Sequence, residues 1–304
     1  MNFERTELLI GTENAAKLAE SSVIVFGVGG VGGYAAEVFA RCGIGKITLV
    51  DFDVVDKSNI NRQIIALNST VGKSKAEVLK ERILDINPTC AVTAICKKAD
   101  KENIYELLNL SSQTPRQAAA AVGQNCCEGA EAGTLQLPPK SALIRADARA
   151  SLGIMKGHPA RAADNNAGAK GYRPLTLSPI PLAGGGLGVG TFNYVIDAID
   201  SVEDKAYLIK ACKDAGLKVI SALGAGNRYK GVPQFEVTDI FKTENDPLAK
   251  VMRKKLKELG VDAAKVVYTK QPADRTGKPV GSIVYYPAIC GLTIASVVIN
   301  EILK

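Results

Sequence analysis

The sequence feature that most constrains the fold is the stretch of residues 21–53, SSVIVFGVGGVGGYAAEVFARCGIGKITLVDFD. It begins with an apolar, mostly β-branched run from Val23 to Phe26, which is typical of a buried parallel strand. Glycines follow at once, and from Tyr34 to Arg41 apolar residues recur at helical spacing. Ile47 to Val50 then predicts a second strand. The stretch therefore predicts one βαβ unit with a glycine loop between its first strand and its helix.

The glycine loop has the spacing G-x-G-x-x-G. Residues without a Cβ atom let the backbone turn sharply and approach a phosphate, which then rests on the amides of the helix N-terminus. Asp51 ends the second strand and is placed for a ribose hydroxyl. A glycine-rich turn in an ordinary α/β protein is the alternative, but the order of strand, helix, second strand and acid favours a nucleotide site. The residues predicted to contact the nucleotide here are Gly27, Gly29, Gly30, Gly32, Asp51 and Asp53.

The composition is that of a soluble globular protein, with 46% hydrophobic residues in a chain of 304. No uninterrupted apolar run is long enough to span a membrane, so we expect a cytoplasmic protein without a membrane span. The seven cysteines include no C-x-x-C pair, so we expect no zinc site.

Residues 113–191 differ in character from the rest of the chain. They are rich in alanine, glycine and proline and lack a sustained hydrophobic period, as in QAAAAVGQNCCEGAEAG. Such a composition cannot offset its ordering entropy by burial, which predicts a loosely ordered insertion. Residues 1–112 and 192–304 then form one nucleotide-binding domain. The single histidine, His158, lies in the insertion, so the chemistry must rest on other groups.

A second group of residues favours a triphosphate over a dinucleotide. Asn59, Arg62 and Gln63 follow the acid-tipped second strand, and Lys75 opens the next predicted helix. Arg and Lys supply fixed positive charge where adenylyl transfer concentrates negative charge. Asp200 follows a strand predicted at 192–198 and is a candidate ligand for the Mg²⁺ that accompanies ATP.

The remaining pattern completes an α/β chain. The C-terminal stretch from residue 282 is apolar but contains Pro287 and Gly291, which we expect to interrupt it, and we expect it in the core or at a subunit interface. Further helices are predicted at Asn2–Leu18, Lys73–Ile86, Lys101–Leu110, up to Lys213 and at 245–260, and further strands at Ala91–Cys96, Lys218–Ser221 and 234–241. The prediction is a Rossmann-like, doubly wound, mainly parallel sheet with an additional C-terminal β/α portion.

Several motifs carry a resemblance to a known superfamily. GVGGVG, DFDxVxxSNxNRQ, VGKSKAE and VIDAIDSVEDK resemble the ubiquitin-activating-type enzymes, which include the adenylyltransferases of thiamin and molybdopterin synthesis. Within this superfamily, RTELLIG, KTENDPLAKVMRKKLKELG and the closing GSIVYYPAICGLTIASVVINEIL look most like the tRNA threonylcarbamoyladenosine dehydratases. The insertion has no counterpart in that pattern.

The resemblance implies an ATP- and Mg²⁺-dependent cyclisation of threonylcarbamoyladenosine in tRNA, through adenylation of its carboxylate and loss of AMP. It implies that the glycine loop cradles phosphate, that Asp51 binds the ribose, and that Asp200 faces Mg²⁺. It also implies a homodimer in which an N-terminal arginine, here Arg5, crosses to the other subunit's ATP. Sulfur-transfer proteins are further candidate partners. The residues to which it gives a catalytic role are Arg5, Arg62, Lys75 and Asp200, and Asn59 and Gln63 join the ATP contacts.

Three other functions remain open at this point. Adenylation of a ubiquitin-like sulfur carrier would use the same ATP site with a protein partner. A nicotinamide-dependent oxidoreductase would leave Asn59, Arg62 and Lys75 without a role, and an idle binding protein would follow if the insertion disturbs the site. The basic helix around Lys254 and Lys255 is predicted to contact the tRNA backbone, with a solvated helix face as the alternative.

Overall fold

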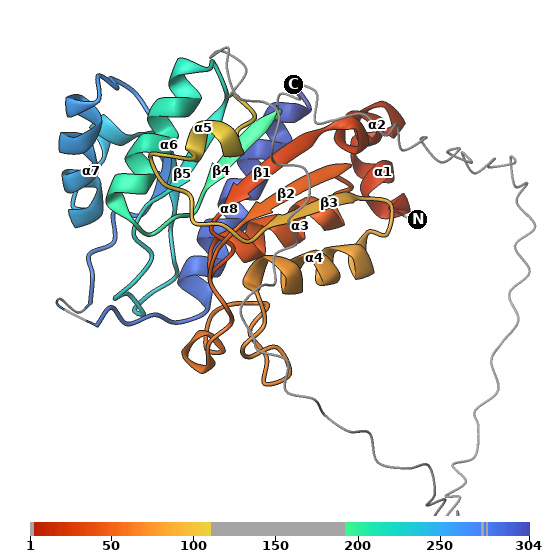
Figure 1. Cartoon of the computed structure of the whole chain (residues 1–304), viewed down its shortest axis with the longest axis horizontal. Helices are drawn as coiled ribbons and strands as arrows, with labels where there is room; N and C mark the ends of the chain where they lie inside the picture. Colours follow the sequence, from red (N-terminus) through yellow and green to blue (C-terminus); the bar gives the residue numbers. More distant parts are fainter. Residues whose placement is uncertain (1–2, 111–191, 275–276, 278) are drawn as a thin grey trace, which may run out of the picture. The chain divides into compact units, whose positions relative to one another are not determined.

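The computed structural model describes residues 3–110, 192–274, 277 and 279–304, and these residues belong to one compact unit. The predicted insertion at 113–191 lies entirely outside the described residues. The described chain forms a seven-stranded sheet in the order β3-β2-β1-β4-β5-β7-β6 (Figure 1). Its strands are β1 Ser22–Phe26, β2 Lys46–Val50, β3 Ala91–Ile95, β4 Tyr194–Asp197, β5 Val219–Ala222, β6 Glu236–Asp239 and β7 Lys265–Tyr268.

Every neighbouring pair of strands is parallel except β6 and β7, so the predicted mainly parallel sheet is confirmed. The chain winds outward from β1 to β3 and then returns to the other side of β1 with β4. This reversal between β1 and β4 leaves a crevice at the carboxyl ends of the two strands, where ligands bind in open α/β sheets.

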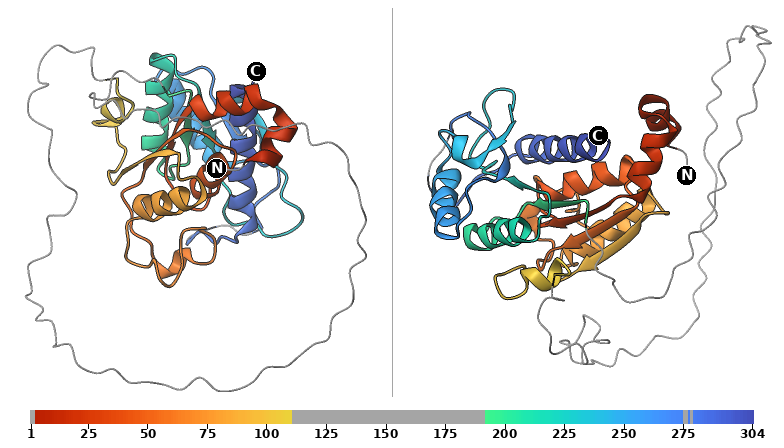
Figure 2. Two further views of the ribbon diagram at one scale, coloured as in Figure 1. Left: turned by 90° about the vertical axis from the view of Figure 1, so that its right-hand side faces the viewer. Right: turned by 90° about the horizontal axis from the view of Figure 1, so that it is seen from above.

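Helices cover both faces of the sheet. One core cluster joins β1 to α3, α4 and α8, and a second joins the opposite face of β1 to α5 and α6. A third cluster packs α7 against α6 and β7. Figure 2 shows α8 alongside α3, the helix that follows the glycine loop. The helices are α1 Glu4–Ile10, α2 Thr12–Glu20, α3 Gly32–Arg41, α4 Lys75–Ile86, α5 Ile104–Leu107, α6 Val202–Asp214, α7 Pro247–Glu258 and α8 Tyr285–Ile302, with 3-10 turns η1 Lys57–Asn59 and η3 Ile240–Lys242.

Strand β1 is buried on both sides, as its continuous apolar sequence predicts. Val23 and Val25 belong to the first core cluster, whereas Ile24 and Phe26 belong to the second. All four side chains are completely buried. Alternate side chains of one strand therefore anchor both helical layers, and this fixes the position of the glycine loop that follows.

The N-terminal segment differs from its prediction. It forms two helices rather than one, because Gly11 between them has φ +82°, a conformation that ends α1 and that only glycine adopts readily.

The C-terminal segment is not interrupted: α8 runs through Pro287 and Gly291. Pro287 is the third residue of α8, where no intrahelical bond is lost. Gly291 is buried against α3. Among the described helices, α8 is long and apolar enough to cross a membrane, but its inner face forms part of the main core, as expected for the core helix of a globular protein.

Candidate nucleotide-binding site

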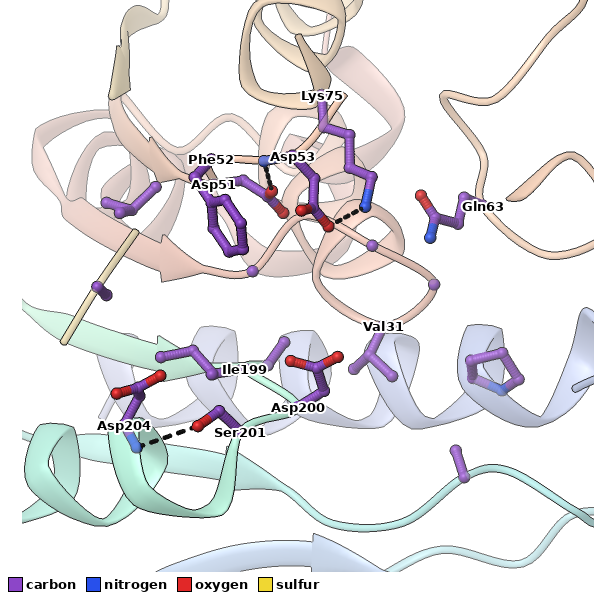
Figure 3. A pocket seen from close by; sticks show the side chains of 18 of the residues that line it. Val31, Asp51, Phe52, Asp53, Gln63, Lys75, Ile199, Asp200, Ser201 and Asp204 are labelled. Atoms are coloured by element: carbon purple, nitrogen blue, oxygen red, sulfur yellow. Dashed lines mark hydrogen bonds and ion pairs between the residues drawn. The ribbon is translucent and has the colours of Figure 1, made fainter. Parts of the chain in front are cut away.

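A cavity of about 410 Å³ opens at the carboxyl ends of β1 and β4, where the strand order reverses (Figure 3). This volume lies within the range of small-molecule sites. The cavity wall contains most of the residues that the sequence assigns to a nucleotide: Gly27, Gly29, Gly30, Asp51, Asp53, Arg62, Gln63, Lys75 and Asp200. The structure therefore brings together residues from five separate parts of the sequence.

The glycines of the loop do two different things. Gly27 has φ +81°, and a Cβ atom there would lie 2.6 Å from the carbonyl oxygen of Ala198. A Cβ atom at Gly32 would lie 1.9 Å from the carbonyl oxygen of Gly27, so this position is a tight helix-strand contact and does not line the cavity. Gly29, in contrast, has only the Gln63 side chain within 4 Å of its Cβ position. Gly27 and Gly32 thus shape the loop, while Gly29 leaves room for a ligand.

Asp51 braces the glycine loop from the end of β2. Its two carboxylate oxygens accept hydrogen bonds from the backbone N–H groups of Val28, at 2.7 Å, and Asp53, at 2.9 Å. Burial raises the pKa of the Asp51 carboxyl, although these two hydrogen bonds act in the opposite direction. Asp51 lines the cavity as predicted, and its contact with a ribose stays a prediction.

Lys75 projects a buried cation into the cavity. It is the first residue of α4, its side chain is only 8% exposed, and its Nζ lies 2.6 Å from Oδ2 of Asp53. A cation at a helix N-terminus opposes the helix dipole, so this position is unfavourable for the helix itself. An anion bound between the glycine loop and α4 would interact favourably with both Lys75 and the helix N-terminus.

Arg62 and Gln63 lie on the segment after η1. Arg62 donates through Nη1 to the carbonyl oxygen of Ser58, at 2.8 Å, and to Asn61. Gln63 is 7% exposed, and its Oε1 is buried without a hydrogen-bond partner among the described residues. Buried amide groups are normally paired, so this orphan acceptor indicates a place where a hydrogen-bond donor of a ligand completes the structure. The Nε2 end of the same amide lies 3.5 Å from the Cβ position of Gly29 and is the end that can donate to a phosphate.

Asn59 does not line the cavity. Its Oδ1 accepts a hydrogen bond from the backbone N–H of Asp56, and its Nδ2 donates to Ser58. The bond from Asp56 to Asn59, together with the side chain of Asp56, forms a capping box that shapes η1, the turn that precedes Arg62. Asn59 therefore stabilises the turn before Arg62 in this structure, and its contact with ATP stays a prediction.

Asp200 is exposed on the connection between β4 and α6 and points into the cavity from the wall opposite the Asp53–Lys75 pair (Figure 3). No cluster of three His, Cys, Asp or Glu side chains suitable for a metal occurs in the part of the chain that the structure describes. This donor set fits Mg²⁺, which typically takes one or two carboxylates and completes its shell with phosphates and water.

Arg5 lies away from this cavity. It belongs to α1, which leads through α2 into the amino-terminal end of β1, whereas the cavity lies at the carboxyl ends of the strands (Figure 1). The neighbouring Leu8 and Leu9 are each 85% exposed.

Sequence reasoning missed part of the wall. Lys97 and Lys98 follow β3, and Asp204 lies in the first turn of α6, 3.5 Å from Lys98. The other missed residues are Val31, Val50, Phe52, Ala99, Ala198, Ile199, Ser201, Ala225, Gly226, Val280, Ser282 and Pro287. A signal existed for some of them, because Gly224-Ala225-Gly226 begins two residues after a predicted strand.

The chain resembles proteins of known activity over almost its whole length. A model of the ThiF family matches residues 3–116. The tRNA threonylcarbamoyladenosine dehydratase of Bacillus subtilis is 31% identical over 321 aligned residues, which cover 99% of this chain and 94% of that protein.

Crystal structures of the Escherichia coli tRNA N6-threonylcarbamoyladenosine dehydratase show the same fold. The complex with ATP is 28% identical and the complex with AMP is 27% identical, each with a TM-score of 0.68 over 99% of this chain and 93% of the other. The chain belongs to the ThiF family and, within it, to the tRNA threonylcarbamoyladenosine dehydratases.

Proposed function

We propose that this protein catalyses the ATP-dependent dehydration of N6-threonylcarbamoyladenosine in tRNA. The observation that carries the proposal is the cavity at the strand-order reversal, where a glycine loop faces the cations Arg62 and Lys75, in a chain that matches dehydratases of this modification end to end. A dinucleotide site has no need of these two cations, whereas a triphosphate does.

In the proposed reaction, a carboxylate oxygen of the threonylcarbamoyl group attacks the α-phosphorus of ATP, and pyrophosphate leaves. The carbamoyl group of the modification then attacks the activated carbonyl carbon and gives up an N–H proton, the ring closes, and AMP leaves. The net change in the nucleoside is the loss of one water. The carboxylate is already ionised at neutral pH, so the first step needs positioning and charge neutralisation more than a general base.

The side chains of the cavity have distinct roles in this scheme. The amides of the glycine loop and the side chains of Arg62, Gln63 and Lys75 bind the phosphates, and Asp51 orients the ribose. Asp200 would hold Mg²⁺, which neutralises charge on the departing pyrophosphate when it is bound. Asn59 supports Arg62 and is the remaining candidate for a direct contact with ATP.

The protein acts as a cytoplasmic homodimer in this proposal. Arg5 cannot serve its own cavity from α1 and is assigned to the partner subunit's ATP. The exposed side chains of Leu8 and Leu9 on the same short helix support this assignment, because large apolar side chains at 85% exposure favour an interface. Residues 113–191 form an insertion in a single adenylating domain, 1–112 with 192–304.

Helix α7 is proposed to contact the tRNA backbone. Not all of its basic side chains are available for this contact, because two of them have partners within the protein. Arg253 donates to the backbone and side chain of Thr243, and Lys255 lies 3.7 Å from Glu203. Lys250 and Lys254 are exposed, and they are the better candidates for phosphate contacts.

Pyrophosphate release from ATP tests the substrate class. We expect release to be stimulated by tRNA carrying threonylcarbamoyladenosine and not by unmodified tRNA or by a ubiquitin-like sulfur-carrier protein. Stimulation by the carrier protein alone would favour adenylation of a carrier instead. Binding of NADH without binding of ATP would favour an oxidoreductase, and ATP binding without turnover would favour an idle binding protein.

A further inference from the structure

A buried polar cluster lies directly behind the cavity wall that carries Asp200. Nζ of Lys205 lies 3.0 Å from Oδ2 of Asp197 and 3.2 Å from Oγ of Ser221. Ser221 in turn donates to Oδ2 of Asp197 at 2.6 Å. The side chains of Asp197 and Lys205 are both 0% exposed, the deepest burial of any ion pair found in the described residues.

The cluster closes the connection between β4 and α6 at both ends. Asp197 is the last residue of β4, and Lys205 lies in the first turns of α6, so the pair ties together the two ends of the segment that carries Asp200. The other oxygen of Asp197 accepts a hydrogen bond from the backbone N–H of Ile199 at 3.1 Å. The carbonyl oxygen of Ala198 faces Gly27 so closely that no Cβ atom would fit there. The same turn therefore touches the glycine loop and presents Asp200.

Stability alone does not account for this pair. Removing two charges from water costs several kcal/mol per ion, and well-packed apolar residues in place of a buried pair are often equally stable. A buried ion pair with complete hydrogen bonding does restrict the geometry of the segments it joins. Here the joined segments define the position of one carboxylate in the cavity.

A similar cluster at the opposite end of β4 offers a comparison. Lys265 lies 2.6 Å from Glu301 and 3.3 Å from the hydroxyl of Tyr194, the first residue of β4. Its two charged side chains are 37% and 23% exposed, and none of its members lines the cavity.

We propose that Asp197, Lys205 and Ser221 are positioning residues that hold the 198–200 turn in the conformation in which Asp200 serves the metal-bound nucleotide. The proposal deepens the proposed function, because it rests on the assignment of Mg²⁺ to Asp200. It concerns only the coupling between Mg²⁺ and nucleotide binding, which is independent of tRNA.

The test measures the Kd of ATP by calorimetry with and without Mg²⁺ and takes the ratio of the two values. The variant combines Lys205→Met with Asp197→Asn, so that no unpaired charge remains buried. Mg²⁺ should lower the Kd of ATP in the wild type. In the double variant, we expect the ratio of the Kd without Mg²⁺ to the Kd with Mg²⁺ to be about tenfold smaller, as is usual for residues that orient a metal ligand. The affinity for ATP without Mg²⁺ should stay within about twofold of the wild-type value, since the fixed cations remain in place. The control Lys265→Met removes an ion pair at the other end of β4 and should leave the ratio unchanged.

A folded double variant with an unchanged ratio overturns the proposal, even if its melting temperature has fallen. If the double variant does not fold, Ser221→Ala decides the question, because it removes one hydrogen bond from Asp197 and leaves the ion pair. It should reduce the Mg²⁺ effect about threefold, and an unchanged ratio would again overturn the proposal. A wild-type protein that binds ATP but does not act on modified tRNA would contradict the proposed function and leave this result standing.

Discussion

Gly291 of α8 lies against the carbonyl oxygen of Val31: a Cβ atom at position 291 would lie 2.4 Å from it. The same Cβ would lie 3.1 Å from Cβ of Tyr34. The C-terminal helix therefore packs directly on the residues that join the glycine loop to α3. This contact couples the last helix of the chain to the shape of the nucleotide site at its beginning.

Gly291→Ala should destabilise the protein by about 1 to 3 kcal/mol, as expected for an extra methyl group in a packed helix contact. The same change should weaken ATP binding, because α3 and the glycine loop must move to make room. Chemical denaturation and calorimetry measure the two effects. The control Ser296→Ala changes an exposed residue of the same helix and should alter neither quantity. An alanine at 291 without loss of stability would mean that α8 and α3 are less closely packed than the structure shows.

Lys75→Met should slow AMP formation about 100-fold, since a fixed cation that faces developing negative charge is lost. The fold should tolerate the change, because Asp53 is 47% exposed and remains solvated without its partner. Steady-state kinetics with modified tRNA measure the effect. Lys80→Met is the control, because Lys80 is on α4, pairs with Glu77 and does not line the cavity. Equal rates of AMP formation for the two variants would show that Lys75 does not act on the phosphates.

Gln63→Leu separates ligand binding from stability. The leucine removes a buried acceptor that has no partner in the described structure, so the free energy of unfolding without ligand should be unchanged or higher. The Kd for ATP should rise about tenfold, the equivalent of one hydrogen bond from the Nε2 amide of Gln63 to a charged phosphate. A loss of stability together with unchanged ATP affinity would show that Gln63 has a structural partner and no ligand contact.

Glu37 predicts a pH dependence of stability. Burial by itself raises the pKa of the Glu37 carboxyl, but the hydrogen bonds from Arg82, at 2.6 Å, and Arg41, at 2.8 Å, outweigh it, and the pKa lies below its ordinary value. The folded state therefore binds the proton less tightly than the unfolded state. The stabilisation is present above the unfolded pKa of about 4.3 and is lost as pH falls through the lowered folded value.

Glu37→Gln should accordingly cost about 1 to 2 kcal/mol at pH 7, as for one hydrogen-bonded charge. The difference from the wild type should shrink as the pH falls below about 4. Urea unfolding at a series of pH values measures it. Glu81→Gln, at an exposed position of α4, is the control and should show no such trend. A difference that is constant over this pH range would contradict the ion-pair account.

The sequence was most informative where structure is local. The unit from β1 to β2 was predicted almost to the residue, because a buried strand, a glycine loop and a helix each leave a pattern within a few positions. Arg62, Gln63, Lys75 and Asp200 were predicted near the loop from their positions after strands or at a helix start, and the structure places all four on the cavity wall.

The far wall could not be predicted, because it depends on contacts between distant segments. Asn227 exchanges two hydrogen bonds with Gly281, its N–H donating at 2.7 Å and its Oδ1 accepting at 2.6 Å, and this joins the loop after β5 to the segment before α8. No local pattern encodes such a pairing. Strand β7 was not predicted, although it is as long as β4, β5 and β6. The sequence predicts an interruption of α8 because Pro287 marks a first turn only once the helix start is known.

The proposed activity of this protein is the ATP-dependent closure of threonylcarbamoyladenosine to a ring. The most direct measurement incubates it with ATP, Mg²⁺ and either modified or unmodified tRNA, quantifies AMP, and determines the mass of the modified nucleoside. We expect AMP release only with modified tRNA, together with a nucleoside lighter by one water. Folded, ATP-binding protein that releases no AMP and leaves the mass unchanged would contradict it.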